Sequence, residues 1–329
     1  MKKILSVSVA SYNLGEMIVE NIESFCKSKV AKKVELIITD DGSRDDTPKI
    51  IEKYAEKYPD TIVFVKKKNE GPGSTVNSGI KHATGKYFRM VDGDDWVKTE
   101  NLEDFVKLLE QTDVDMVVSN YEIFDNEQKQ VIETTKYNLA ENEILSIDNV
   151  YGQVPYQMHG LTFKTEIFKN NDICLDNCFY TDVEYTLFPV PYVKTIEYFN
   201  NTIYMYRVAQ ATQSVNPNSM KKNLAQHDLV LNHIIEYFNL HCENMSKGQI
   251  EYTKKRISDM MDVQLSTMLL FDVSKEQKIK IKTYVQDMKV KCLPAYSIWK
   301  KSKKLKSLVY SNYLLYPFVA KKYCKMISK

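Results

Sequence analysis

The 329-residue sequence lacks any run of about 18 consecutive apolar residues, the length that a membrane-spanning helix requires. It also lacks a Cys-x-x-Cys pair, and its six scattered cysteines indicate the reduced thiols of a cytoplasmic protein. The first residues, MKKILSVSVASYNLG, place lysines before a short apolar run. Because patterned structure follows at once, we interpret this run as a first β-strand and not as a signal peptide.

Acidic residues are absent from the last part of the chain. Residues 288–329 contain eleven lysines and no Asp, Glu or Arg. Since the whole sequence has a net charge of +2, residues 1–287 carry a net charge of about −9. The sequence therefore combines an acidic body with a cationic tail. With 43% hydrophobic residues, the chain is long enough for two domains with cores of their own.

Residues 4–120 alternate between strand-like and helix-like segments. Apolar strands are predicted at ILSVSVAS, VELIITD, TIVFVKK, GKYFRMVD and VDMVVSNY, and helices near residues 14–28, 45–58, 73–83 and 100–110. This alternation predicts an α/β fold with a mostly parallel sheet and helices on both faces. Residues 121–215 are mixed, and three helical segments are predicted near 218–245, 248–271 and 275–290. We therefore expect one domain over residues 1–215, with halves 1–120 and 121–215, and a helical domain over 216–329.

Carboxylates gather where two of the predicted strands end. Asp40 and Asp41 follow the second strand, and Asp92, Asp94 and Asp95 follow the fourth in FRMVDGDDWVK. Ligands of parallel sheets bind beyond the carboxyl ends of the strands, so both groups are expected at one edge. Such close carboxylates repel one another. A solvated acidic turn would explain one group. A divalent cation that bridges the protein and a diphosphate would explain both.

Other motifs for this region fail on their spacing. A calcium loop beginning at Asp92 would need an oxygen ligand and a glycine where Trp96 and Val97 stand. GIKHATGKY is one residue too long for a phosphate-binding P-loop, and GPGSTVNSG lacks the Gly-x-Gly-x-x-Gly of a dinucleotide-binding turn. The metal–diphosphate interpretation is the one that remains.

The segments SVSVASYN, VELIITDDGSRDDT and NEGPGSTVNSGIKHATGKYFRMVDGDDW follow one another between residues 4 and 120. In order and spacing they resemble an inverting family 2 glycosyltransferase with a GT-A fold, and a weaker likeness continues to about residue 215. The resemblance implies transfer of a sugar from a nucleotide diphosphate-sugar, usually a UDP-sugar, with inversion at the anomeric carbon. It also implies a bound Mn²⁺ or Mg²⁺.

The resemblance also assigns donor-binding residues. Tyr12 would stack on or beside uracil, and Asp41, or else Asp40, would accept a hydrogen bond from the pyrimidine N3–H. Asp92 would contact the ribose or the metal, and Asp94 would be a metal ligand. The further donor contacts carried over from the family are Ala10, Ser11, Asn77 and Arg207. A supporting role for Asp95 is left open.

The second half of the first domain is expected to supply the catalytic base. Inversion in a single step requires a carboxylate that deprotonates the acceptor hydroxyl. The family's Glu-Asp pair corresponds to FYTDVEYTLF, in which Asp182 matches the Asp and Thr181 replaces the Glu, with Glu184 as a second candidate. For Asp182 the alternative is a carboxylate favoured by the dipole at a helix start. His159 and Trp96 are predicted on the acceptor side, with a purely structural role as the alternative for each.

The cationic tail interleaves lysines with aromatic and aliphatic residues, from SIWKKSKKLK to AKKYCKM. This pattern predicts peripheral attachment to an anionic membrane surface on the cytoplasmic side, close to a lipid-linked acceptor. A solvated helix face is the alternative. Nucleic acid is not an expected partner, because the tail has no arginine and no known binding motif. Pairing of two copies through the helical domain is left open.

These features predict a metal-dependent inverting hexosyltransferase that uses a UDP-sugar and a glycan acceptor to make a bacterial capsule, exopolysaccharide or other surface glycan. Two replacements within the family pattern support an alternative. Val76 stands where an arginine often precedes the asparagine, and Thr181 stands where a glutamate is usual. On that basis the chain would be a non-catalytic nucleotide-sugar-binding protein or a regulatory partner of another glycosyltransferase.

Overall fold

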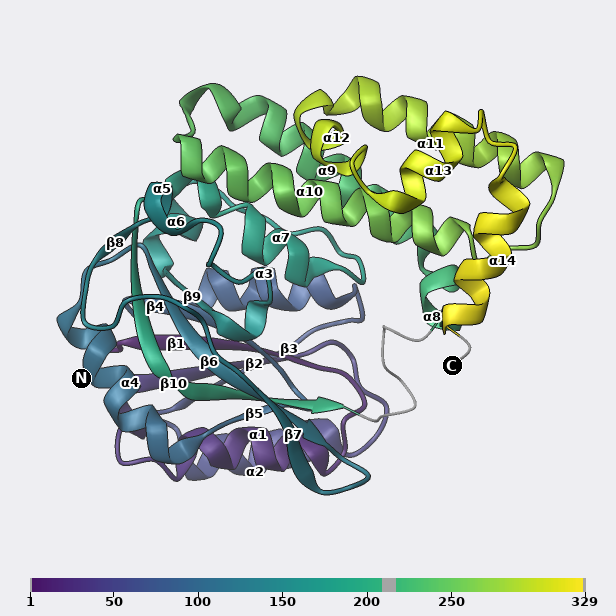
Figure 1. Cartoon of the computed structure of the whole chain (residues 1–329). Coiled ribbons are helices and arrows are strands. Elements are labelled where there is room, and N and C mark those ends of the chain that lie inside the picture. Colours follow the sequence, from purple (N-terminus) through teal and green to yellow (C-terminus); the bar gives the residue numbers. More distant parts are fainter. Residues whose placement is uncertain (1, 209–216, 328–329) are drawn as a thin grey trace. The chain divides into compact units, whose positions relative to one another are not determined.

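The computed structural model describes residues 2–208 and 217–327. The chain forms two compact units, residues 1–211 and 212–329 (Figure 1). The boundary predicted near residue 215 lies outside the described residues. Within the described ranges, no helix combines the length and the apolar character that crossing a membrane requires.

The first unit is built on a ten-stranded sheet with the order β3-β2-β1-β4-β9-β6-β10-β5, with β7 paired to β6 and β8 paired to β10. Its parallel half consists of β1 (Leu5–Ser11), β2 (Val34–Asp40), β3 (Ile62–Lys66) and β4 (Tyr87–Asp92). The other half contains β6 (Met116–Asp125) and β10 (Thr195–Val208), which are parallel to each other. The short strands are β5 (Trp96–Val97), β7 (Gln130–Thr135), β8 (Leu145–Ser146) and β9 (Leu161–Lys164).

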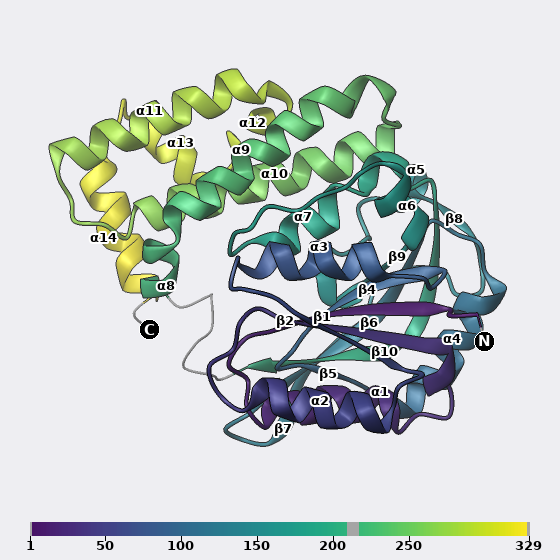
Figure 2. The ribbon, with the colours of Figure 1, turned by 180° about the vertical axis from the view of Figure 1, so that it is seen from behind.

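The sheet is a buried layer with helices on both faces, as predicted (Figures 1 and 2). Every residue of β2 is buried, which explains why the strand is apolar throughout and does not alternate. One face is covered by α1 (Met17–Cys26) and α2 (Thr47–Lys57), and α4 (Thr99–Gln111) packs against β10. The opposite face is covered by α3 (Pro72–His82), α6 (Thr165–Asn170) and α7 (Thr181–Leu187). The remaining short helices are α5 (Ile147–Val150), η1 (Ala31–Lys33), η2 (Met158–Gly160) and η3 (Val190–Tyr192).

One strand differs from the expected arrangement. The sequence predicts VDMVVSNY as a fifth strand of a mostly parallel sheet and does not predict β9, which lies between β4 and β6 and is antiparallel to both. The chain reaches β9 only after the excursion through β7 and α5, so β6 joins the sheet one position further out. The sheet is therefore mixed, with two parallel parts joined by an antiparallel strand.

The second unit is entirely helical in its described part, and the three helical segments predicted from the sequence are confirmed. Its helices are α8 (Pro217–Lys222), α9 (Leu224–His241), η4 (Cys242–Asn244), α10 (Lys247–Met268), α11 (Lys275–Lys291), α12 (Leu293–Trp299), α13 (Lys303–Tyr310) and α14 (Tyr316–Ile327). The cationic tail is folded into this unit. Trp299 is 1% exposed, and its indole Nε1 donates a hydrogen bond to Asp262 Oδ1 at 3.0 Å. Lys304 Nζ forms an ion pair with the other oxygen of Asp262 at 2.9 Å.

Candidate active site

The acidic turn after β4 meets the carboxyl end of β1, as the sequence predicts. The two strands are parallel neighbours in which Ala10 pairs with Asp92. Gly93 makes the close approach possible, because a Cβ there would lie 2.5 Å from the Ala10 carbonyl oxygen. On the other side of β1, Ser11 pairs with Asp40, and Asp41 N donates a hydrogen bond to Ser11 O at 2.9 Å. The ends of the three strands thus form one edge.

Asp95 is the buried anchor of this turn and is 2% exposed. Its carboxylate accepts hydrogen bonds from the Tyr204 hydroxyl at 2.6 Å and from the backbone N–H of Arg207 at 2.7 Å. The Tyr204 hydroxyl in turn accepts a hydrogen bond from Asp92 N at 3.2 Å. From α1, Asn21 Nδ2 donates to the backbone oxygens of Asp95 and Asp92 at 2.8 and 3.1 Å. The turn is therefore held between β10 and α1.

The side chain of Arg207 also contacts the acidic turn and stabilises it. Its Nε donates to Asp94 O at 2.7 Å, its Nη2 pairs with Glu20 at 2.5 Å, and its guanidinium lies 4.5 Å from the centre of the Trp96 ring. The family resemblance assigns Arg207 a contact with the donor, at a phosphate of its diphosphate. The contacts seen here are with protein groups, and the side chain is buried, so the phosphate contact stays a prediction.

The carboxyl groups of the turn resist ionisation together. Burial raises the pKa of Asp92 to about 8, and repulsion from Asp94 and Asp182 adds to the effect. Burial also raises the pKa of Asp94, although Arg207 opposes the shift. The pKa of Asp95 is raised well above its usual value, by burial first and then by Asp94 and Asp92. A bound cation would lower the pKa of each neighbouring carboxyl group, because it favours the ionised form.

His159 joins the acidic turn from η2. Asp92, Asp95 and His159 each offer a ligand atom, and these atoms lie within 4.8 Å of one another. The imidazole lies among Tyr204 and Tyr206, with ring centroids 4.6 and 4.4 Å away. Its Nδ1 is buried and has no hydrogen-bond partner among the described residues. Burial, with a contribution from the positive charge of Arg89, lowers the pKa of His159 to about 3, so the ring is neutral near pH 7.

Two carboxylates suit Mn²⁺ or Mg²⁺ with additional oxygen ligands, and the neutral imidazole is a ligand that a transition metal such as Mn²⁺ accepts more readily than Mg²⁺ does. The residues present therefore fit the implied metal, with Asp94 half-buried in the same turn. The sequence predicts Asp92 and Asp94 as ligands and His159 as an acceptor-side residue. A lone histidine carries no local signal for metal binding, and the proximity of His159 to Asp92 arises only from the fold.

Several residues expected to touch the donor instead hold loops together. Asp41 accepts hydrogen bonds from the backbone N–H groups of Glu70 and Gly71, both at 2.9 Å. Asn77 forms a two-point pair with the backbone of Leu175, to which its Nδ2 donates and from which its Oδ1 accepts, each at 2.8 Å. These contacts were not foreseen, and the predicted donor contacts of Asp41 and Asn77 stay predictions.

The remaining donor candidates lie where β1 and β2 end. Asp40 accepts hydrogen bonds from Ser43 N at 3.1 Å and Ser43 Oγ at 2.5 Å, so it closes its own turn. Tyr12 is 45% exposed, and a ring in that position is accessible to a base. Ala10 is half-buried, and Ser11 is buried with no hydrogen-bond partner for its hydroxyl among the described residues.

Asp182 is the second residue of α7, and the loop that precedes α7 packs against α3. Gly71 and Gly73 of the GPGS segment lie against this loop. A Cβ on Gly73 would overlap the Asp176 carbonyl oxygen and lie 2.5 Å from the Asp176 carbonyl carbon and 2.8 Å from Thr181 Cγ2. No role for these glycines is predicted from the sequence, although two glycines at the start of a predicted helix were the available signal.

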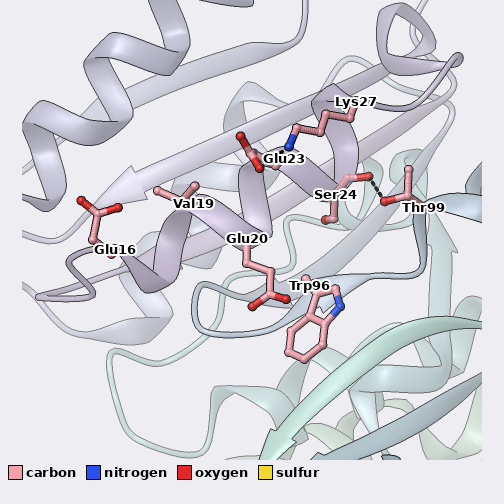
Figure 3. Close-up of a pocket in the computed structure, with 8 residues that line it drawn as sticks. All are labelled: Glu16, Val19, Glu20, Glu23, Ser24, Lys27, Trp96 and Thr99. Carbon is pink, nitrogen blue, oxygen red and sulfur yellow. Dashed lines mark hydrogen bonds and ion pairs between the residues drawn. The ribbon is translucent and has the colours of Figure 1, made fainter. Parts of the chain in front are cut away.

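The contacts of Glu184 and Trp96 are with protein groups. Glu184 is completely buried, accepts a hydrogen bond from Asp176 N at 2.6 Å, and has its pKa raised to about 8 by burial. It supports the loop before Asp182, and its role as a base or acceptor-side residue stays a prediction. Trp96 lines a pocket of about 420 Å³ beside α1 (Figure 3). The pocket is lined by Glu16, Val19, Glu20, Glu23, Ser24, Lys27, Trp96 and Thr99. It contains none of the carboxylates of the acidic turn, so the acceptor role of Trp96 stays a prediction.

Comparisons with known proteins match the first unit of the chain by sequence. The model of the family described as "Glycosyl transferase family 2" matches residues 6–173. Glycosyltransferase GlyG of Streptococcus pneumoniae serotype 4 is 32% identical over 125 residues, which are 38% of this chain and 41% of GlyG. The poly(ribitol-phosphate) beta-N-acetylglucosaminyltransferase TarS of Staphylococcus aureus is 28% identical over 172 residues, 51% of this chain and 29% of TarS. Each of these matches spans less than half of the relative's own length.

Solved structures extend the likeness to both units of the chain. S. aureus TarS 1-349 in complex with UDP has a TM-score of 0.68 and 17% sequence identity, covering 98% of this chain and 90% of that chain. The complex of the same TarS fragment with UDP-GlcNAc has a TM-score of 0.64 and 18% identity, covering 98% and 89%. At these identities the likeness concerns the fold.

Proposed function

This chain belongs to glycosyl transferase family 2 and is a glycosyltransferase, and from that premise we propose that it transfers a sugar from a UDP-sugar to a hydroxyl group of a glycan, with inversion. The UDP and UDP-GlcNAc complexes of TarS, which has the same fold, support a UDP-sugar as donor. Relatives named for the synthesis of surface polymers, TarS and the minor teichoic acid biosynthesis protein GgaB of Bacillus subtilis, support a bacterial surface glycan as product. A lipid-linked form of the acceptor is part of the proposal.

The observation that carries the proposal is the convergence of Asp182 on the acidic turn. Asp182 comes from α7, ninety residues after Asp92, and its charge contributes to the raised pKa of Asp92 after burial and the charge of Asp94. In the proposed reaction Asp182 accepts the proton of the acceptor hydroxyl while that oxygen attacks the anomeric carbon. The bond between this carbon and the diphosphate oxygen breaks on the opposite side, and UDP leaves. Thr181, in place of the family's glutamate, leaves Asp182 as the carboxylate that performs this step.

The acidic turn and His159 would hold Mn²⁺ or Mg²⁺. When bound, the metal would act as a Lewis acid and neutralise charge on the departing diphosphate. Asp92, Asp95 and the neutral His159 form the cluster whose donor atoms would hold the metal, and Asp94 in the same turn would be a further ligand. Asp95 also fixes the turn through its bonds to Tyr204 and Arg207.

The first test is Asp182→Asn, which removes the base and retains the shape of the side chain. We expect turnover, measured as UDP release from a UDP-sugar with and without a glycan acceptor, to fall roughly a hundred- to ten-thousand-fold. UDP affinity, measured by calorimetry, should stay nearly unchanged. Asp104→Asn is the matched control, because Asp104 is an exposed carboxylate on α4. Unchanged turnover in the Asp182 variant would remove Asp182 from the mechanism.

The second test concerns the metal. UDP binding should weaken strongly when Mn²⁺ is removed with a chelator, and Asp94→Ala should weaken it to a similar extent even with Mn²⁺ present. Asp104→Ala, which removes a carboxylate outside the site, should bind UDP like the unmodified protein. Equal UDP affinity with and without the chelator, and in the Asp94 variant, would exclude a metal bridge.

A further inference from the structure

Helices α13 and α14 follow each other near the end of the second unit (Figure 1). The turn between them exposes a group of large apolar side chains, which we call the apolar tip. Tyr310 is 84% exposed, Leu314 77% and Phe318 67%. The complete tip consists of Val309, Tyr310, Leu314, Leu315 and Phe318. Exposed apolar groups are common singly, but five within ten residues form a patch of the kind that marks an interaction site.

The conformation of the turn keeps these side chains outside the core. Asn312 and Tyr313 both adopt left-handed backbone angles, with φ of 46° and 61°. This reverses the chain sharply and allows Tyr313 N to donate to Leu308 O at 2.7 Å. The residues that pack inward from this region are Leu305, Leu308, Tyr313, Tyr316 and Ala320. These residues fill the core side of α13 and α14, so the exposed residues of the apolar tip are not needed for packing.

Exposed lysines lie one helical turn behind the tip on both helices. Lys306 precedes Tyr310 by four residues on α13, and Lys321 and Lys322 follow Phe318 by three and four residues on α14. One turn corresponds to about 5 Å along a helix axis. Lys304 is excluded from this group, because it pairs with Asp262 inside the unit. The surface therefore has an apolar end with cationic flanks.

We propose that the apolar tip docks on an anionic lipid bilayer, with the tip side chains among the acyl chains at the boundary and the flanking lysines at the headgroups. Amphipathic elements at a membrane surface insert to roughly 5–10 Å, which matches a one-turn separation between apolar and cationic groups. Aromatic side chains such as Tyr310 favour this boundary region. The proposal goes beyond the function proposed above and does not depend on it.

Charge and polarity favour a bilayer over other occupants. Residues 288–329 contain eleven lysines and no acidic residue. A symmetric contact between two copies through this surface would therefore bring like charges together. A soluble polyanion would engage the lysines but would leave Leu314, Leu315 and Phe318 in water. An anionic bilayer engages both kinds of group.

The test is co-sedimentation of the full chain with vesicles of phosphatidylcholine alone or mixed with phosphatidylglycerol. One variant removes charge (Lys306→Gln, Lys321→Gln, Lys322→Gln), and another removes apolar groups (Leu314→Ser, Leu315→Ser, Phe318→Ser). The matched controls on α11 are Lys275→Gln with Lys282→Gln, and Ile279→Ser, since these residues are exposed outside the tip. Circular dichroism verifies that each variant keeps its helices.

We expect binding to the anionic vesicles and little to phosphatidylcholine alone, with affinity lowered roughly tenfold or more by each tip variant and unchanged by the controls. Equal binding of the unmodified protein and both tip variants would overturn the proposal. Loss of binding in the lysine variant but not in the apolar variant, together with equally tight binding to inorganic polyphosphate, would assign the surface to a polyanion. A dimer that the apolar variant dissociates, without vesicle binding, would assign it to a second copy.

Discussion

Gly73→Ala is expected to disturb the catalytic unit through a single methyl group. Gly73 lies in the first turn of α3, directly against the loop that leads to Asp182. The new Cβ would lie 2.5 Å from the Asp176 carbonyl carbon, where ordinary contacts between carbon atoms begin at about 3.5 Å. Because the Asp176 carbonyl oxygen lies closer still, helix and loop must separate by more than about 1 Å, unless the loop bends locally.

The size of the effect follows from this displacement. Overpacking of a close contact of this kind costs about 1–3 kcal/mol. For a unit of this size, each kcal/mol lowers Tm by about 2–4 °C. Because a misplacement of about 1 Å at a reacting group lowers turnover by roughly a hundredfold, activity should fall more than stability does. The Asn77–Leu175 pair lies one helical turn further along α3 and should limit the shift but not cancel it.

Scanning calorimetry gives the change in Tm, and UDP release gives the change in turnover. Gly152→Ala is the matched control, because a Cβ on Gly152 would meet no atom within 4 Å. UDP affinity should be nearly unaltered in both variants, since the displaced loop lies on the acceptor side in the proposed mechanism. If Gly73→Ala retained the turnover and Tm of the Gly152 variant, the inference that α3 positions the Asp182 loop would be refuted.

Two further predictions concern buried polar groups. Tyr204→Phe removes the hydroxyl that donates a hydrogen bond to Asp95 at 2.6 Å, and it should lower the free energy of unfolding by about 1–3 kcal/mol. If the urea concentration at the unfolding midpoint were unchanged, this hydrogen bond would not stabilise the fold. Burial lowers the pKa of His227 to about 4. Between pH 6.5 and 4 the unfolded chain therefore binds a proton that the folded chain does not. The free energy of unfolding should consequently fall by up to about 3 kcal/mol as the pH decreases through this range. In a Trp96→Phe background the fluorescence of Trp299 reports the unfolding of the second, helical unit. His227→Gln should flatten the pH dependence of its stability between pH 6.5 and 4. An unaltered slope would show that His227 is not the group responsible.

The parts of the fold that could be predicted are those whose signals are local. Strands β1 to β4 and helices α1 to α4 follow from apolar periodicity and, for α2, from helix-start residues such as Pro48, whereas the two-residue strand β5 was not predicted. The position of β9 could not be predicted, because four residues, Leu161–Lys164, carry too short a pattern to specify which strands they will separate. Its pairing with β4 and β6 is decided by contacts distant in the chain.

The same distinction applies to the site. The acidic edge was predictable, because carboxylates that directly follow parallel strands must converge. The contacts of Asn77 were not, since its partner Leu175 lies 98 residues away in the sequence. His159 likewise reaches Asp92 and Asp95 only through η2 and β9. A family pattern assigns roles to positions, whereas the hydrogen bonds of those positions depend on loops that the pattern does not describe.

The pairing of Ala10 with both Thr39 and Asp92 makes the number of residues in each strand a functional property. Successive side chains point to opposite faces, so one residue inserted into or deleted from β4 would turn Asp92 toward the wrong side while leaving the composition of the strand almost unchanged. Related chains can therefore change length in these strands only by even steps, or must compensate an odd step within the turns. The number of residues between the start of β4 and its terminal aspartate is thus a simple criterion. It separates related chains that keep the acidic turn from chains that have lost it.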